Sequence, residues 1–481
     1  MGTSANTAPV IVWFRQDLRL TDNPALHAAV ETGAPVLPVY ILDDDNAGDY
    51  SMGAASRWWL HHSLTSLNES LGGTLVIKSG NAAALLPALA RDIGAQHVYW
   101  NRCYEPWRIQ RDSAIKVTLR GDDRSVRSFN GSLLFEPVNV LKSDRTPYRV
   151  FTPFYRNARE ANEASLRAPL EAPAKLNLLH GQQDLSIDDL GLLPDIPWYE
   201  EMATLWQPGE DGARARLAEF LDGGLDNYKE GRDRPDLRNV SRLSPHLHYG
   251  EISPNQAWFA AADYDELHPK HVEHFQRELG WREFSYNLLF HFPTLPFENF
   301  QRKFNRFPWR GDQDQLEQWQ RGMTGVPIVD AGMRELWRTG YMHNRVRMIV
   351  GSFLVKNLMI DWRHGEKWFF DTLLDADLAS NSASWQWIAG CGADAAPYFR
   401  IFNPVTQGKK FDPNGDYVRE YVSEIAAIPN QYLHNPWEAP ADVLQQAGVD
   451  LGGDYPKPLV DLKASRQRAL DAFSSLRSAS D

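Results

Sequence analysis

The N-terminal part of the chain alternates short apolar runs with amphipathic stretches. Four runs rich in β-branched and aromatic residues have the length of strands buried on both faces, and they cover residues 10–14, 35–42, 74–78 and 97–101. Helical patterns lie between them, at 23–33, 56–72 and 81–94. Asp22 is the expected N-cap of the first helix. This alternation predicts a doubly wound α/β domain with a parallel sheet, whose ligand would lie at the carboxyl edge of the strands.

The turn after the first predicted strand gives no sign of a standard nucleotide site. It reads RQDLRLTDNP at residues 15–24, and neither G-x-G-x-x-G nor a P-loop opens the helix that follows. A dinucleotide or nucleoside triphosphate site of the usual kind is therefore not expected in this domain.

The pattern changes twice after residue 140. Between 141 and 205, frequent Pro, Asp, Leu and Asn break up any period, which is typical of a long interdomain connection. From 206 to 481 helical patterns prevail without a convincing strand, so this part is predicted to be all-α. We therefore expect an α/β domain at 1–140, a linker at 141–205 and a helical domain at 206–481. The expected helices of the last part cover 213–223, 271–292, 333–338, 344–360 and 365–378.

Composition supports a large folded protein. The 481 residues are 43% hydrophobic and 23% charged, which is typical of a globular chain of two or three domains. Charges interrupt the apolar runs before they reach membrane-spanning length, and the polar start lacks the regions of a signal peptide. Only Cys103 and Cys391 are present, without the spacing of metal ligands. We therefore expect a cytosolic protein without a metal site or a membrane segment.

One segment, residues 300–310, is locally basic although the net charge is −12. The negative total argues against a protein that coats nucleic acid non-specifically, but it does not exclude a local basic face. Cationic and aromatic side chains alternating in this way are expected of a surface that contacts phosphates and stacks on bases, although a solvated charged face explains them equally well. The residues concerned are Arg302, Lys303, Arg306 and Arg310, interleaved with Phe300, Phe304, Phe307 and Trp309.

The helical part holds most of the 17 tryptophans, more than packing alone requires. A buried indole usually packs, but it can also stack on a base or a flat cofactor, or lend an electron to a strong oxidant. Trp385 and Trp387 raise this question most directly, because they stand one residue apart in ASNSASWQWIAG at 379–390.

Polar residues on the predicted helices could accompany these indoles. Glu278, Trp281 and Arg282 are spaced to share one helix face, where they could line a pocket or form a salt-bridged surface. Asn344 and Met348 are four residues apart, and an inward-facing Asn offers a donor and an acceptor to a polar ring edge.

Two further groups are candidate ligands of an anion or a cofactor. Asp375 and Asp377 could cap a helix end, or could hold a cofactor's donors and an arginine. In NVSRLS at 239–244, the hydroxyls of Ser241 and Ser244 precede a proline-led helix, as in an anion site, although such turns are common.

Together these segments resemble the DNA photolyase and cryptochrome flavoproteins, specifically the bacterial cyclobutane pyrimidine dimer photolyases of classes I and III. The resemblance extends from VWFRQDLRLTDNPAL at 12–26, through SRLS, WREF and TGVPIVDAGMRELWRTGYMHNRVRM, to WQWIAGCGADAAPYFRIFNPVTQGKKFDPNGDYV. It implies an N-terminal α/β antenna domain and a C-terminal helical domain that encloses FAD.

The resemblance also implies roles around the cofactor. At the FAD diphosphate and ribose it places Tyr228, Ser241, Leu243 and Ser244. Beside the flavin it places Arg282, Arg347, Asp375, Asp377 and Asn381, with an ion pair between Arg347 and Asp375. A chain that carries electrons inward to oxidised FAD would consist of Trp385, Trp362 and Trp309.

The remaining roles concern damaged DNA. Glu278 and Asn344 would hydrogen-bond the dimer and Met348 would pack beside them. Trp281 and Trp387 would form the aromatic wall of the lesion pocket. The DNA backbone would be held by Arg232, Arg345 and Arg400, beside the basic Arg302 and Lys303.

The reaction implied by the resemblance is light-dependent repair of cyclobutane pyrimidine dimers in UV-damaged DNA. Reduced FAD supplies one electron to the dimer and receives it back, while the protein orients the reactants and excludes water. The damaged nucleotides must leave the helical stack, a step that is described for photolyases as a class. No obligate protein partner is evident.

Some positions differ from the family pattern. Trp107 and Arg108 stand where the folate-binding class I enzymes carry Asn-Glu. The segment MGAASRWWL at 52–60 looks closer to class III, which implies methenyltetrahydrofolate bound differently, with a deazaflavin or no antenna as alternatives. Val240 stands where Thr is usual, and ADLASNSAS at 376–384 replaces a more glycine-rich sequence.

Two other functions are less favoured. A six-four photolyase is expected to carry His at positions 344 and 348, and commonly Gln at position 278. A cryptochrome would be a light-sensing signalling protein, and such proteins often carry long C-terminal extensions, whereas the tail here is short.

Overall fold

A computed structural model describes residues 8–162, 166–180, 185–395 and 399–478. The N-terminal part contains one five-stranded parallel sheet with the strand order β3-β2-β1-β4-β5, which confirms the predicted fold class. The strands are β1 (Val10–Phe14), β2 (Val36–Leu42), β3 (Val76–Ser79), β4 (His97–Asn101) and β5 (Ser125–Phe129).

The central strands are buried on both faces. Along β1, Val10, Val12 and Phe14 pack into one hydrophobic cluster, and Ile11 and Trp13 pack into another on the opposite face. Successive side chains of a strand point to opposite faces, so a strand buried on both faces appears as a continuous apolar run. The edge strand β5, with the sequence SVRSF and mostly exposed or half-buried residues, lacks that signal and was not predicted.

Helices cover the sheet. The predicted N-cap of the first helix, Asp22, is wrong. The N-cap of the first helix is Asn23, whose side chain accepts the Leu26 amide at 3.1 Å. Asp22 instead has a positive φ of 51° and a fully buried carboxylate that accepts hydrogen bonds from Arg167, the Leu170 amide and Ser253, so it ties the α/β domain to later parts of the chain. The helices of this domain are α1 (Pro24–Val30), α2 (Ala54–Ser70), α3 (Ala82–Asp92) and the unpredicted α4 (Pro106–Gly121).

The segment predicted as a linker contains regular structure as well as extended chain. A helix that the sequence did not indicate, α5 (Phe151–Asn162), packs Phe151 and Phe154 into the same hydrophobic cluster as the helix that carries Trp281. Leu178 forms a parallel bridge with Val36 of β2, and α6 (Glu200–Leu205) closes the segment. The domain boundaries at 140 and 205 stay a prediction.

After β5, the described residues contain helices and no further strand, as predicted. The helices are α7 (Glu210–Glu219), α8 (Tyr228–Gly231), α9 (Ser244–Tyr249), α10 (Pro254–Ala262), α11 (Pro269–His291), α12 (Gln313–Gln320), α13 (Pro327–Thr339), α14 (Asn344–Ser352), α15 (Trp362–Thr372), α16 (Leu378–Ala389), α17 (Pro404–Phe411), α18 (Asp416–Tyr421), α19 (Asn430–Leu433), α20 (Ala441–Ala447) and α21 (Leu462–Ser478). A π-helical turn at Phe353–Leu358 follows α14, and a 3-10 helix covers Arg302–Arg306.

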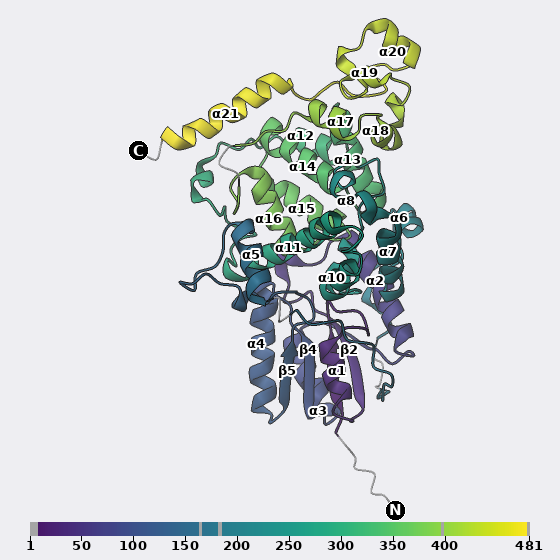
Figure 1. Cartoon of the computed structure of the whole chain (residues 1–481), viewed down its shortest axis with the longest axis vertical. Helices are drawn as coiled ribbons and strands as arrows, with labels where there is room; N and C mark the ends of the chain where they lie inside the picture. Colours follow the sequence, from purple (N-terminus) through teal and green to yellow (C-terminus); the bar gives the residue numbers. More distant parts are fainter. Residues whose placement is uncertain (1–7, 163–165, 181–184, 396–398, 479–481) are drawn as a thin grey trace, which may run out of the picture.

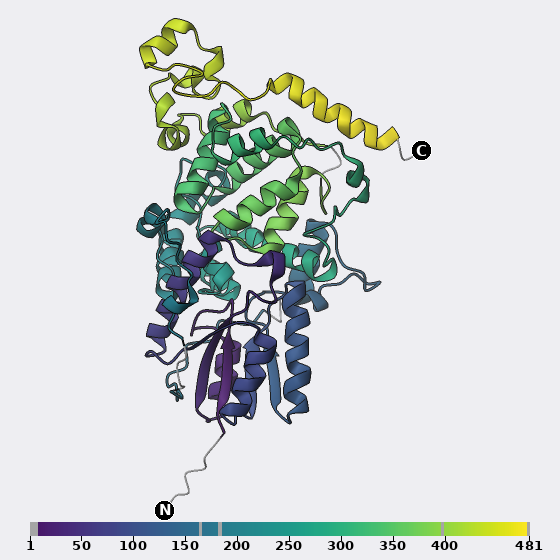
Figure 2. The same cartoon turned by 180° about the vertical axis from the view of Figure 1, so that it is seen from behind.

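The two halves are stacked along the long axis of the molecule. Figure 1 shows the sheet at the end that holds the N-terminus, with the helical half above it, and Figure 2 shows the same order from behind. The carboxyl ends of the parallel strands face the helical half, so the edge where a ligand is expected lies between the two layers. The predicted helix at 365–378 ends early, at Thr372, and α16 begins at Leu378 although its small polar residues form helices only weakly.

Candidate functional site

Two helices with predicted lesion-binding residues meet at a pair of neighbouring residues, Arg232 and Asp233. Arg232 donates to the Glu278 carboxylate of α11 at 2.6 Å, and Arg345 of α14 donates to Asp233 at 2.8 Å. Burial raises the pKa of Glu278, and the charge of Arg232 opposes this effect. The sequence indicated Glu278, Arg232 and Arg345, but not Asp233, because nothing in its local pattern distinguishes it from a solvated acid.

The start of α14 presents polar side chains in a fixed arrangement. The side chain of His343 caps the helix by accepting the Arg345 amide at 3.2 Å, and Asn344, the first helical residue, is exposed. Met348 is half-buried one turn later, and its sulfur lies 3.7 Å from an Arg345 nitrogen. Asn344 and Met348 therefore lie one turn apart, as their spacing predicted, and the contact of Met348 with Arg345 is one that the spacing did not indicate.

A buried acid, Glu335 of α13, holds the N-terminal end of α14. Its carboxylate accepts the His343 amide at 3.2 Å and the Tyr417 hydroxyl at 2.6 Å. Burial raises the pKa of Glu335 to about 7. Sequence reasoning did not single out this residue, because only the tertiary structure brings α13, α14 and α18 together around it.

The face of α11 that carries Glu278 does not present its three candidates to a single partner. Trp281 stacks on Phe151 of α5, with ring centroids 3.7 Å apart and planes 10° from parallel. Arg282 donates to the Ser132 carbonyl at 2.9 Å and to Glu283 at 3.1 Å. One face of the Trp281 indole is therefore covered by a helix that the sequence did not predict.

Of the two acids before α16, Asp377 forms the expected helix cap, and Asp375 pairs with an arginine as the expected cofactor site requires. Asp377 is the N-cap of α16, since it accepts the Ser380 amide at 2.7 Å, and it also accepts the Tyr286 hydroxyl. Burial opposes ionisation of Asp377, but His248 and Arg282 outweigh it and lower the pKa. The expected ion pair between Arg347 and Asp375 is present at 2.9 Å.

The remaining predicted cofactor residues lie in buried or half-buried positions. Asn381 is buried and donates to the Glu366 carbonyl at 2.9 Å. Tyr228 is buried against Phe220 and Phe275. In the 239–244 turn, the Ser241 hydroxyl accepts the Leu243 amide at 3.4 Å, and Ser244 begins α9. The donor and acceptor set fits FAD, because the second oxygen of Asp375 is buried without a hydrogen-bond partner in the described structure and could accept a donor of the flavin ring.

Trp385 and Trp387 have different surroundings. Trp385 is 3% exposed and packs against Phe369 and Trp319, and a Cβ at Gly365 would lie 2.2 Å from its ring. Trp387 is half-buried and lines a cavity together with Lys356, Arg400 and Phe402. The residue between the two indoles, Gln386, was missed by the sequence reasoning.

Gln386 fastens α16 to the segment at 295–301. It is fully buried, donates to the carbonyls of Leu295 and Glu298 at 2.6 and 2.8 Å, and accepts the Phe300 amide at 2.8 Å. The three contacts use most of the hydrogen-bonding capacity of the amide group. A polar residue between two tryptophans is the only signal in the sequence that could have pointed to it.

The other two tryptophans of the expected chain belong to the same hydrophobic cluster as Trp385. Trp362 begins α15 and is fully buried, and its indole N–H donates to Asn299 at 2.9 Å. Trp309 is partly exposed and packs against Phe307, with ring centroids 4.4 Å apart.

The basic segment is only partly the surface that was expected. Arg302 and Lys303 are exposed, in accordance with a role in DNA binding. Phe304 and Phe307, however, are 1% and 4% exposed and belong to the core, so they are not available to stack on bases. The 3-10 helix at 302–306 directs Phe304 inward and leaves Arg302 and Lys303 outside, and Phe307 packs into the core from the extended residue that follows the helix.

A cavity lies at the carboxyl edge of the sheet, where a ligand was expected. It is open to solvent, and side chains from both halves line it, among them Arg15, Trp107, Arg108, His248 and Ala376. We call it the interdomain cavity.

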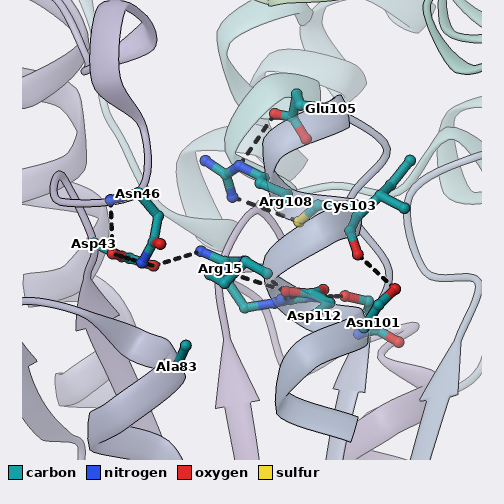
Figure 3. Close-up of polar contacts among 12 residues, drawn as sticks. Arg15, Asp43, Asn46, Ala83, Asn101, Cys103, Glu105, Arg108 and Asp112 are labelled. Atoms are coloured by element: carbon teal, nitrogen blue, oxygen red, sulfur yellow. Dashed lines mark hydrogen bonds and ion pairs between the residues drawn. The ribbon is translucent and has the colours of Figure 1, made fainter. Parts of the chain in front are cut away.

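Ion pairs hold the arginines around the interdomain cavity (Figure 3). Arg15 pairs with Asp112 at 2.9 Å, and Arg108 lies 3.3 Å from Glu105 and 3.5 Å from the Cys103 sulfur. Burial raises the pKa of the Cys103 thiol, so it stays protonated. Because each of these arginines already faces an acid or a thiol, their orientation is fixed before any ligand binds.

Two expected absences concern metals and membranes. In the part of the chain that the structure describes, no helix is both long and apolar enough to cross a bilayer. In that same part, no group of His, Cys, Asp and Glu side chains is placed to hold a metal ion.

Comparisons with known proteins agree with this architecture. Residues 10–174 match the family model described as DNA photolyase, and residues 275–475 match the FAD binding domain of DNA photolyase. The chain belongs to the DNA photolyase and cryptochrome family.

Within the family, photolyases and cryptochromes both resemble this chain. A deoxyribodipyrimidine photo-lyase of Agrobacterium fabrum is 51% identical over 98% of this chain and 99% of its own length. The crystal structure of a class III photolyase from Agrobacterium tumefaciens superposes with a TM-score of 0.95 at 50% identity, covering 99% of both chains. Cryptochrome-1 of Arabidopsis thaliana is 38% identical over 97% of this chain and 70% of its own length.

Proposed function

We propose that the protein is a deoxyribodipyrimidine photo-lyase of class III type that repairs cyclobutane pyrimidine dimers in UV-damaged DNA in a light-dependent reaction. The observation that carries the proposal is the junction at Arg232 and Asp233, which brings Glu278 of α11 and the Asn344 end of α14 together. A carboxyl and an amide at this junction can hydrogen-bond the polar edges of two adjacent bases. Likeness to a photo-lyase over the whole chain supports the same function.

The residues around Asp375 would hold FAD, which supplies the light-driven donation of one electron when it is bound. Arg347 balances the charge of Asp375, and Asp377 fixes the start of α16, one turn before Asn381. Arg282 would lie beside the cofactor and the lesion. Tyr228, Ser241, Leu243 and Ser244 would hold the diphosphate and ribose.

The lesion pocket would be completed by Met348 and by the Trp281 and Trp387 indoles. Trp387 shares its cavity with Arg400, so an aromatic surface for a flipped base lies beside a cation for the backbone phosphate. Arg232, Arg345, Arg302 and Lys303 would add further phosphate contacts, of which Arg232 and Arg345 are already fixed by acids. Trp385, Trp362 and Trp309 would pass electrons inward to oxidised FAD.

We further propose that the interdomain cavity holds an antenna chromophore, with methenyltetrahydrofolate as the first candidate. The Trp107 ring lines the cavity, with the Arg108 guanidinium carbon 4.7 Å from the ring centroid, and Arg15 and Arg108 offer positive charge for an anionic tail. Reconstitution with methenyltetrahydrofolate or a deazaflavin, with FAD fluorescence excitation as the readout, tests this in wild type and Trp107→Ala. If Trp107→Ala abolishes the energy transfer seen in wild type, the result supports this site. If energy transfer is equally strong in wild type and Trp107→Ala, the antenna chromophore binds elsewhere.

The repair assay compares wild type with Glu278→Ala and Asn344→Ala on a thymine-dimer oligonucleotide under light, after reduction of the bound FAD. We expect both variants to lose at least about tenfold in repair, because each would leave a base edge without its partner. Glu273→Ala, an exposed acid on the same helix, is the matched control and should repair normally. Photoreduction of FAD without repair in wild type would instead favour a cryptochrome-type photoreceptor, which the likeness to plant cryptochromes makes the second candidate.

The compartment that we propose is the bacterial cytosol, with no obligate protein partner. Both cysteines are free and buried, in accordance with a reducing environment.

A further inference from the structure

The indole N–H of Trp362 is sealed from water and has a defined acceptor. Trp362 is fully buried, and Asn299, whose Oδ1 accepts this N–H at 2.9 Å, is 4% exposed. No other acceptor for the Trp362 N–H is recorded in the described ranges of the chain. Any proton that left Trp362 would therefore have to go to Asn299.

The amide of Asn299 is held in one orientation. An indole N–H is only a donor, so the carbonyl oxygen of Asn299 must face it, and the Asn299 NH₂ then donates to the Asn305 oxygen at 2.8 Å. The backbone on both sides is also fixed, because Gln386 binds the Glu298 carbonyl and the Phe300 amide. Asn299 is therefore pinned by Gln386, the residue between Trp385 and Trp387.

The charges near Trp362 disfavour an electron hole that remains on its ring. The Arg363 guanidinium carbon lies 4.6 Å from the Trp362 ring centroid. Asp361 accepts from Arg363 at 3.0 Å and compensates part of this charge. An amide carbonyl can stabilise a positive indole through its dipole, but it is far too weak a base to remove the proton.

We propose that Asn299 is a positioning residue that keeps the proton on Trp362 while an electron hole passes through it. This inference rests on the proposed function, because it requires electron transfer along Trp385, Trp362 and Trp309. Trp362 then acts only as a relay, and the proton is released at the partly exposed Trp309.

Each electron and proton in the transfer along the three tryptophans has a defined donor and acceptor. Once Trp385 has given one electron to the bound cofactor, Trp362 returns one electron to Trp385 and becomes an indole radical cation. Trp309 then reduces Trp362 and releases its own N–H proton to water. A thiol reductant from the medium returns one electron and one proton to Trp309. If Trp362 lost its proton first, the neutral radical would be a weaker oxidant and the hole would remain inside.

The test removes the electron donor that follows Trp362, so that the electron hole remains on Trp362, and measures whether the Trp362 radical keeps its N–H proton. In Trp309→Phe, transient absorption after a light pulse should show an indole radical cation that decays by recombination without becoming the neutral radical. In the double variant Trp309→Phe with Asn299→Asp, the introduced carboxylate should accept the Trp362 proton at a pH where it is ionised, so the long-lived neutral radical should form. At lower pH, where the carboxyl is protonated, the radical cation should return.

Asn305→Asp in the same background is the matched control. It adds the same charge beside the Asn299 NH₂ group, but it has no contact with the indole, so the radical cation should persist. In the dark, the ¹⁵N–¹H resonance of the Trp362 indole should shift in Asn299→Leu, which reports the hydrogen bond without any activity of the loaded enzyme.

Two results would overturn the inference. A neutral radical in Trp309→Phe alone would mean that the proton has another acceptor, and a radical cation at every pH in the Asn299→Asp variant would mean that position 299 does not control the proton. Undiminished FAD photoreduction in Trp362→Phe would overturn the tryptophan chain together with this inference. A loss of dimer repair by chemically reduced wild type, with the radical spectra as expected, would overturn only the repair function.

Discussion

Replacing Gln386 by Leu should loosen the attachment of α16 to the 295–301 segment. The side chain is fully buried and makes hydrogen bonds of 2.6 and 2.8 Å to two carbonyls and of 2.8 Å to the Phe300 amide. Leucine has a similar volume but leaves these backbone groups without a partner. Leu295 is buried and Phe300 half-buried, whereas Glu298 is exposed, so we count two groups that water cannot easily reach.

Each buried group left unsatisfied costs about 1–3 kcal/mol, so the local opening free energy should fall by about 3 kcal/mol. Hydrogen exchange of the Phe300 amide measures this directly, and protection should decrease by roughly 100-fold, because 1.4 kcal/mol corresponds to about a factor of ten. Gln446→Leu changes an exposed glutamine of α20 and is the matched control. Unchanged protection of Phe300 in Gln386→Leu would refute the argument that this side chain holds the segment.

Three further predictions concern stability and DNA binding. Glu335→Gln should weaken the pH dependence of stability. Because the pKa of Glu335 is raised to about 7, the wild-type carboxyl contributes stability that is present below about pH 4.5 and lost as the pH rises through 7. The difference between the free energies of unfolding at pH 5 and pH 8, measured by chemical unfolding, should therefore be smaller in the variant by about 1–3 kcal/mol. Gly365→Ala should destabilise the protein by about 1–3 kcal/mol and change the fluorescence of Trp385, because the added methyl would lie 2.2 Å from that ring, and a normal melting temperature would contradict this. Lys303→Ala should reduce the slope of log affinity for dimer DNA against log salt by about 0.9, whereas Lys175→Ala, at an exposed position in the segment 141–205, should leave the slope unchanged.

The sequence was most informative where burial is uniform along an element. The runs at 10–14 and 97–101 correspond to β1 and β4, because a strand covered on both faces must be apolar throughout. Edge position removed that signal from β5, whose polar residues face solvent. The helix α5 was missed for a related reason, since it lies in a segment whose flanking Pro and Asp residues obscure the period.

Local chemistry also misled in two places. Asp22 and Asn23 are both good N-caps, and the choice between them depended on Arg167 and Ser253, which bind Asp22 from distant parts of the chain. The aromatic residues of the basic segment were expected to stack on bases, but Phe304, in a 3-10 helix, and Phe307, directly after it, are buried in the core.

The sequence by itself determined the α/β and helical halves and the absence of a standard nucleotide motif, and it proposed site residues through motifs that resemble a known family. Only the tertiary structure decided how those residues are connected: that Arg232 and Asp233 join α11 to α14, that Glu335 holds the start of α14, and that Gln386 and Asn299 fasten the tryptophans. The physical reason is that periodicity records which face of an element is buried, whereas a hydrogen bond between two different elements leaves no periodic trace in the sequence.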